Sequence, residues 1–237
     1  VVVTHGTDTL ELTAFVASLL VPPSVPVVFT GSMRPHSHDD PDGPRNMRDS
    51  IIVAASQWSG GVTVCMNGEL HAPRRVRKLN ASSVEAFFSI PYGPVGHVAG
   101  GVVSSIADVP VQHPLPIPTD LCHDVVAVTV FPGMGDTDLR RMAGDARAVV
   151  VEVFGDLNAP MQIWGVLHEW SSAGRLVVLA SGAYTPTVDN DFTQMLGLVG
   201  AGGLTTQKAR IAAMLALSDG RTIVEASDYL RLLGRHQ

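Results

Sequence analysis

Residues 1–10 read Val1-Val2-Val3-Thr4-His5-Gly6-Thr7-Asp8-Thr9-Leu10. The first four are β-branched and predict a short buried strand. Gly6 allows a sharp turn after it, and the apolar-rich residues 12–21 predict a helix. Thr7 and Asp8 therefore lie at the carboxyl end of a predicted strand, which is where open α/β sheets bind their ligands.

The alternation of strand and helix continues through the first half of the chain. Residues 26–30 and 62–66 predict two further strands. Between them, Pro44 suits the first turn of a helix that we expect to reach Trp58, before Gly60-Gly61. Strands separated by helices pair in parallel through right-handed crossovers, so this half predicts a parallel sheet.

The second half shows the same alternation after a change of composition. Residues 106–122 hold four prolines and little periodicity, which predicts an interdomain linker. Strands are then predicted at 125–130, 148–153 and 176–180, and helices at 138–142, 161–173, 205–217 and 222–233. Thr205 is a suitable N-cap for the third of these helices. The sequence thus predicts two α/β domains, at 1–105 and 123–237.

Composition excludes several classes of protein. With 46% apolar and 16% charged residues, the 237-residue chain can bury a sizeable core. No run reaches the roughly 18 apolar residues that would span a bilayer. The net charge of −6, with dispersed basic residues, argues against nucleic-acid binding. Two cysteines make no disulfide framework, and the nine histidines show no metal-ligand spacing.

The scarcity of lysine draws attention to Lys78. The chain has only two lysines, Lys78 and Lys208, among 16 basic residues. A threonine hydroxyl needs a base to take its proton, and a lysine, unlike an arginine, can serve as that base. Lys78 follows the third predicted strand, so it could reach the sheet edge where Thr7 and Asp8 lie. On spacing alone, the alternative of a surface lysine beside a helix-capping Thr-Asp pair is favoured.

A resemblance to a known family changes that balance. Residues 2–9 resemble the second active-site signature of the bacterial-type L-asparaginase family. Further similar motifs follow in the same order: Thr30-Gly31-Ser32-Met33-Arg34-Pro35, Asp42-Gly43-Pro44 with Asn46, residues 74–80 around Lys78, Ala86-Phe87 with residues 92–96, Pro132-Gly133, residues 155–158 and residues 205–209. These motifs cover nearly the whole chain, which makes the resemblance specific.

The resemblance implies an asparaginase-like α/β fold, with a larger N-terminal parallel-sheet domain and a smaller C-terminal α/β domain. It implies hydrolysis of the side-chain amide of asparagine, and sometimes of glutamine, without a metal or cofactor. Asp8 would bind the α-amino group of the substrate. Thr7 would relay a proton or take part in acyl transfer, and Lys78 would accept that proton.

The same resemblance extends to the pocket and the assembly. Ser32 and Met33 would line the substrate pocket, with the Ser32 backbone or hydroxyl near the scissile amide. Asn158 would contribute to the site of a neighbouring subunit in a homodimer or homotetramer. An acidic contact is expected after the strand at 176–180, and both Asp189 and Asp191 are candidates.

Some alternatives stay open at this stage. The family's first active-site segment, a glycine-rich turn with the nucleophilic threonine, has no match in this sequence, so we expect the first strands of the N-terminal domain to be missing from residues 1–237. A chain without that segment could be a non-catalytic or truncated amino-acid-binding homologue. The amidase subunit of a glutamine-dependent transamidosome is a second alternative. Arg34 is expected to pair with Asp39 or Asp42, and the cysteine content favours the cytoplasm.

Overall fold

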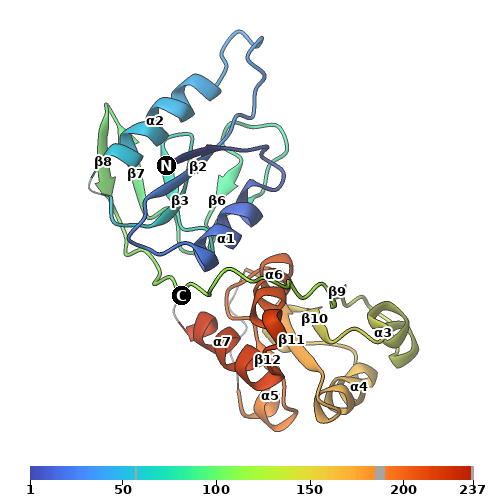
Figure 1. Cartoon of the computed structure of the whole chain (residues 1–237). Coiled ribbons are helices and arrows are strands. Elements are labelled where there is room, and N and C mark those ends of the chain that lie inside the picture. The colour runs from blue at the N-terminus through green and yellow to red at the C-terminus, as the bar shows by residue number, and fades with distance from the viewer. Residues whose placement is uncertain (57, 185–189, 236–237) are drawn as a thin grey trace. The chain divides into compact units, whose positions relative to one another are not determined.

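The computed structural model describes residues 1–56, 58–184 and 190–235 (Figure 1). The chain divides into two compact units, Val1–Pro114 and Leu115–Gln237. The division falls inside the segment 106–122, and the linker itself stays a prediction. Each unit is built from α-helices and a β-sheet, so the α/β fold class is confirmed. Within the described ranges, no helix is both long and apolar enough to cross a membrane.

The N-terminal unit is built on a six-stranded sheet. Its order is β1 (Val2–Thr4), β2 (Val27–Thr30), β3 (Val62–Met66), β4 (Glu69–His71), β7 (Gly96–Ala99) and β8 (Val102–Ser105). The first three strands pair in parallel, as predicted. The last three join by antiparallel pairing, which the sequence did not predict. A separate two-stranded sheet pairs β5 (Arg77–Lys78) with β6 (Phe87–Phe88).

Two tight turns explain the antiparallel pairings of β3 with β4 and of β7 with β8. Met66 pairs with Glu69, so Asn67-Gly68 forms a two-residue hairpin loop, with φ values of 51° and 79°. Gly100-Gly101 closes β7 and β8 in the same way, with φ values of 58° and 82°. Both pairs favour the left-handed backbone that such hairpins need. These dipeptides are the signal in the sequence that would have revealed the strands.

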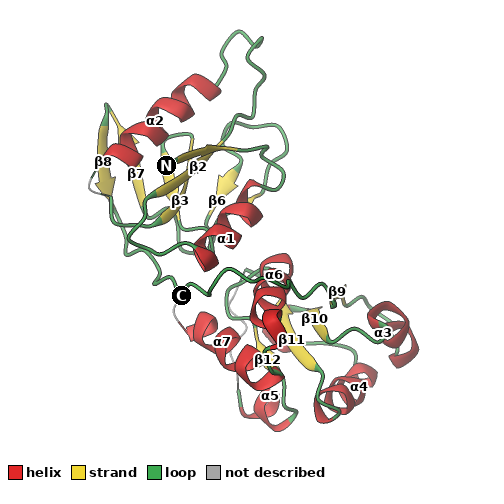
Figure 2. Ribbon diagram, in the orientation of Figure 1, coloured by secondary structure: helices red, strands yellow, loops and turns green. Residues whose placement is uncertain are grey.

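Two helices cover opposite faces of the six-stranded sheet (Figure 2). Leu10 and Ala14 of α1 (Leu10–Leu20) pack in one buried cluster with Phe29 of β2. Val53 of α2 (Gly43–Ala55) packs in another with Val28 of the same strand. Neighbouring residues of a strand point to opposite faces, so β2 contributes to both clusters. Both faces of this part of the sheet are therefore buried.

Helix α2 is shorter than predicted. It ends at Ala55, because Ser56 turns to an extended conformation with ψ of 178°. The Ser56 N–H and hydroxyl both donate to the carbonyl oxygen of Val53, at 3.2 Å and 2.8 Å. This local capping stops the helix before Trp58, and Gly60-Gly61 lies beyond its end.

The C-terminal unit has a fully parallel sheet, in the order β12 (Val199–Gly200), β11 (Leu176–Ser181), β10 (Ala148–Val153) and β9 (Val125–Thr129). Its helices are α3 (Asp136–Ala143), α4 (Met161–Ser172), α5 (Asp191–Met195), α6 (Thr206–Ala216) and α7 (Ile223–Arg235). Side chains of α3 and α4 share one apolar cluster with β10 and β11. Thr205 caps α6 as predicted, accepting a hydrogen bond from the Lys208 N–H.

Candidate active site

Lys78 meets Thr7 and Asp8 in the N-terminal unit. Thr7 and Asp8 lie in the turn between β1 and α1, and Lys78 is the second residue of β5. The Lys78 Nζ atom donates hydrogen bonds to Thr7 Oγ1 at 2.9 Å and to Asp8 Oδ1 at 2.6 Å. The structure therefore brings together three residues that the sequence singled out. We call them the Lys78 cluster, and the roles assigned to them stay predictions.

The Lys78 cluster combines a mostly buried cation with an exposed anion. The side chain of Lys78 is 15% exposed, which is against the alternative of a solvated surface lysine, whereas that of Asp8 is 91% exposed. The hydrogen bond from Lys78, together with its positive charge, lowers the pKa of the Asp8 carboxyl below its ordinary value. Asp8 is therefore anionic at neutral pH, where a cationic group of a ligand can reach it.

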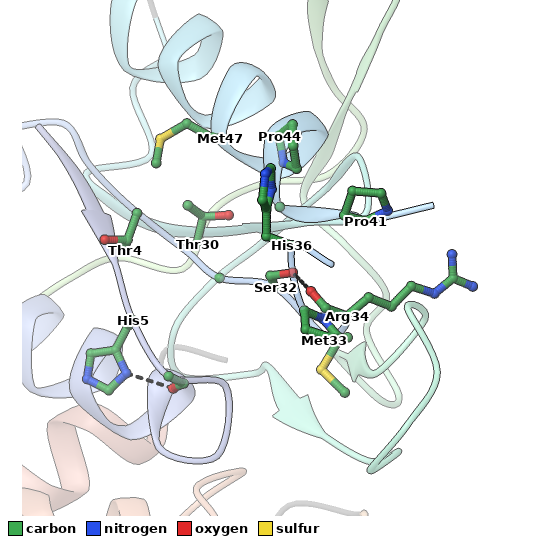
Figure 3. A pocket seen from close by; sticks show the side chains of 14 residues that line it. Thr4, His5, Thr30, Ser32, Met33, Arg34, His36, Pro41, Pro44 and Met47 are labelled. Atoms are coloured by element: carbon green, nitrogen blue, oxygen red, sulfur yellow. Dashed lines mark hydrogen bonds between the residues drawn. The ribbon is translucent and has the colours of Figure 1, made fainter. Parts of the chain in front are cut away.

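His5 stabilises the turn that contains Thr7. Its Nδ1 atom lies 2.7 Å from the carbonyl oxygen of Gly6. The dashed line at His5 in Figure 3 marks this hydrogen bond. A carbonyl oxygen only accepts, so Nδ1 carries a proton in this arrangement. Nε2 lies 3.0 Å from Thr13 Oγ1 on α1, so the ring joins the turn to the helix. His5 thus fixes the main chain just before Thr7.

A cavity of about 760 Å³ opens at the carboxyl ends of β1 and β2 (Figure 3). It is lined by the ends of both strands, the loop after β2 and the first residues of α2. Ser32 and Met33, which the resemblance assigns to a substrate pocket, both line it. The cavity approaches the Lys78 cluster at His5 and Gly6, while the three residues of the cluster lie outside its lining.

A buried carboxylate holds the loop that forms one wall of this cavity. Asp42 accepts hydrogen bonds from Ser32 Oγ at 2.6 Å and from the N–H groups of Met33 and Arg34 at 2.9 Å each. The Asn46 side-chain amide donates a fourth at 3.1 Å. Asp42 itself is 2% exposed. We call these five residues the Asp42 clamp, which the sequence did not predict.

The electrostatics of the clamp favour the ionised carboxylate. Burial opposes ionisation of Asp42, but the hydrogen bonds from Met33, Ser32 and Arg34 together outweigh it and lower the pKa of the carboxyl. The Ser32 hydroxyl, which also lies 2.5 Å from the Arg34 carbonyl oxygen, is thereby held within the loop. Its backbone remains the better candidate for contact with a substrate.

The prediction that Arg34 forms a salt bridge with Asp39 or Asp42 is wrong. Its guanidinium pairs with Asp40 at 2.6 Å, and with neither Asp39 nor Asp42. The reason is local, because donors of the loop itself already occupy the oxygens of Asp42. Arg34 belongs to the Asp42 clamp through its main-chain N–H and not through its guanidinium.

The remaining predicted residues belong to the C-terminal unit. Asn158 is exposed, follows a short 3₁₀ helix (Gly155–Leu157) and donates from Nδ2 to the Gly155 carbonyl oxygen at 2.9 Å. Leu157 adopts a φ of 60°, which glycine adopts more easily. Asp191 lies in the first turn of α5, and Asp189 lies outside the described residues. The role of Asn158 in a neighbouring site stays a prediction.

Comparisons with known proteins match both units. The family model "Asparaginase, N-terminal" matches residues 1–110, and "Glutaminase/Asparaginase C-terminal domain" matches residues 124–230. L-asparaginase 2 of Escherichia coli strain K12 is 32% identical over 92% of this chain and 66% of its own length. The probable periplasmic L-asparaginase of Haemophilus influenzae is 30% identical, over 92% of this chain and 65% of its own.

A solved structure supports the same relationship. The probable cytoplasmic L-asparaginase of Campylobacter jejuni superposes with a TM-score of 0.84 at 28% identity, covering 97% of this chain and 76% of the other. The chain spans 66% and 65% of the two curated relatives described above, so it corresponds to about two thirds of their length.

Proposed function

This chain belongs to the bacterial-type asparaginase family, and on that premise we propose that it hydrolyses the side-chain amide of L-asparagine to L-aspartate and ammonia. The observation that supports the proposal most directly is the Lys78 cluster. It joins a hydroxyl, an amine and an ionised carboxylate within hydrogen-bond distance at the carboxyl end of a parallel strand.

Asp8 binds the substrate in this proposal. Its carboxylate is anionic, and the hydrogen bond to Lys78 engages Oδ1 of a side chain that is 91% exposed. The α-amino group of asparagine is a cation that pairs with such a carboxylate by a charge-assisted hydrogen bond. Contact with Asp8 would hold the amino acid beside Thr7, and the backbone of the Ser32–Met33 loop would border the pocket.

Thr7 and Lys78 carry out the proton transfer in this proposal. The Lys78 Nζ and Thr7 Oγ1 atoms are 2.9 Å apart, so Lys78, once its ammonium group has given up a proton, can accept the hydroxyl proton across this contact. In one route the Thr7 oxygen attacks the amide carbon and carries the acyl group. In the other route a second nucleophile attacks the amide carbon, carries the acyl group and gives its proton to Thr7. The proton passes to the amide nitrogen, which leaves as ammonia, and water hydrolyses the acyl intermediate to aspartate. Asp8 stabilises the ammonium form of Lys78 meanwhile.

Assembly and location are further parts of the proposal. We propose that Asn158 serves the site of a neighbouring copy in a homodimer or homotetramer. Dilution to monomer should then abolish substrate binding, and a monomer that binds as well as the oligomer would refute it. Cys65 and Cys122 are both free thiols, which fits a reducing compartment such as the cytoplasm.

Ammonia release from L-asparagine and L-glutamine, compared between the wild-type protein and Lys78→Met, tests the proposed reaction. We expect turnover of asparagine by the wild type and a loss of about 10³-fold in the variant, which lacks the proton acceptor. The melting temperature should stay the same. Arg77→Met is the matched control, because alternation along β5 turns that side chain the other way. Full turnover by Lys78→Met would contradict the mechanism.

A further inference from the structure

The main chain of Lys78 has its own anchor. The Lys78 N–H donates a hydrogen bond to Glu11 Oε2 at 2.8 Å, across 67 positions of the sequence. Glu11 lies in the first turn of α1, three residues after Asp8, and its side chain is partly buried. No motif singled out in the sequence includes this glutamate.

The strand that carries Lys78 needs such an anchor. β5 is two residues long and, among the described strands, pairs with the equally short β6 alone, outside the six-stranded sheet. So short a pairing supplies few backbone hydrogen bonds to fix its position, to which the Leu79 N–H adds one to the Ala86 carbonyl oxygen at 2.8 Å. Lysine adds a flexible four-carbon stem between its main chain and its ammonium group. The position of Nζ therefore depends on how firmly the main chain at residue 78 is held.

Glu11 holds the main chain of Lys78 against the start of α1, where Thr7 and Asp8 also lie. Thr7 and Asp8 lead directly into α1, and Glu11 belongs to the first turn of that helix. One end of the helix therefore presents the hydroxyl, the carboxylate and the acceptor for the Lys78 N–H. Three hydrogen bonds, one from the main chain and two from Nζ, join Lys78 to this segment.

We propose that Glu11 is a positioning residue that sets the reach of Lys78 toward Thr7 and Asp8; its catalytic consequence rests on the proposed function. Glu11 acts through a hydrogen bond to the backbone and not as a countercharge. The bond joins its carboxylate to the amide N–H, while Nζ bonds Thr7 and Asp8. A neutral amide oxygen accepts the same bond, so Glu11→Gln should preserve the geometry and Glu11→Leu should lose it.

The first test needs no turnover. Only two residues are lysines, so protein labelled with ¹⁵N-lysine gives two backbone amide signals, from Lys78 and Lys208. In Glu11→Leu we expect the Lys78 amide proton to move upfield and to exchange with solvent about tenfold faster. In Glu11→Gln it should stay near its wild-type position. Lys208, in the other unit, is the internal control. An unchanged Lys78 signal in Glu11→Leu would overturn the proposal.

The second test measures kcat and KM for asparagine hydrolysis. Glu11→Leu should lower kcat about tenfold, because small displacements of a catalytic group are costly, while KM changes less than about twofold. Glu11→Gln should recover kcat to within about threefold of wild type. Glu85→Leu, at an exposed glutamate near β6, should change neither constant. If Glu11→Gln were as impaired as Glu11→Leu, charge would be the operative property and positioning would be wrong.

Lys78→Met, measured beside these variants, distinguishes a failure of the positioning role of Glu11 from a failure of the proposed function. If Lys78→Met is inactive and Glu11→Leu turns over normally, the positioning role fails and the proposed function stands. If Lys78→Met keeps its turnover, the proposed mechanism fails, and the amide signal of Lys78 still decides whether Glu11 anchors the strand.

Discussion

Two carboxylates at the same end of the N-terminal unit have opposite surroundings. Asp8 bonds Lys78 and has a side chain that is 91% exposed. Asp42 is 2% exposed and accepts hydrogen bonds from Ser32, Met33, Arg34 and Asn46. Both have a lowered pKa, so ionisation alone does not distinguish them. The two carboxylates differ in how many of their hydrogen-bond acceptor positions remain open. The exposed Asp8 can still bind a ligand, whereas the oxygens of Asp42 are occupied by the protein and hold the chain.

We expect Thr7→Val to have the largest effect, because it removes a hydroxyl from the Lys78 cluster with little change of shape. If the cluster is chemical and not structural, turnover of asparagine should fall about 10³-fold. The melting temperature should stay near that of the wild type, because the side chain holds no buried loop. Ammonia release and thermal unfolding measure the two quantities. A large loss of stability with residual turnover would make the cluster a structural element.

Asp42→Ala should have the next largest effect, and on stability. It leaves the N–H groups of Met33 and Arg34 without their acceptor, at a cost of about 3 kcal/mol in the free energy of unfolding. The Ser32 hydroxyl and the Asn46 amide keep the carbonyl oxygens of Arg34 and Gly31 as acceptors. Urea unfolding measures this cost.

The control for Asp42→Ala lies two residues away. Asp40→Ala removes an exposed carboxylate that pairs with Arg34 at the surface, with a side chain that is 74% exposed. Its cost should be at most about 1 kcal/mol. Equal destabilisation by Asp40→Ala and Asp42→Ala would remove the distinction between a saturated and an open carboxylate.

The smallest effect is on the pH dependence of stability. A carboxyl whose pKa is lower in the folded state stabilises the fold above its ordinary pKa of about 3.9, and this stabilisation disappears as the pH falls through the lowered value. The wild type should therefore lose stability between about pH 5 and pH 3 more steeply than Asp42→Asn. Urea unfolding at a series of pH values gives the two slopes. Parallel slopes would mean that the Asp42 charge does not contribute.

Local signals in the sequence were enough for most regular elements. The strands predicted at 62–66 and 148–153 agree with β3 and β10 to the residue, because dense β-branched runs are bounded by clear breaks. The strands β4, β7 and β8 escaped prediction. They have three or four residues each, and their pairing depends on the hairpins at Asn67-Gly68 and Gly100-Gly101.

Some residues of the candidate site could be predicted from the sequence and others could not, because only some of them give a local signal. Lys78 stood out because lysine is scarce and because strand ends meet at one edge of a sheet. The sequence singled out Asp42 within a motif but did not predict that it holds the loop, since most of its partners are donors of that loop and no spacing rule reveals such bonds. Glu11 was missed because its partner is a backbone N–H, which every residue but proline possesses.

The attachment of Lys78 to the start of α1 has a mechanical consequence. Because Thr7, Asp8 and Glu11 belong to one short segment, a rigid displacement of this segment with α1 keeps the distances among these three groups, and only three hydrogen bonds join Lys78 of β5 to them. Fraying of the first turn is different, since it separates these groups. Thr9, at the N-cap, makes no side-chain cap, and main-chain bonds from Leu12 and Thr13 close the turn. The geometry of the cluster thus depends on the first turn of α1 staying folded.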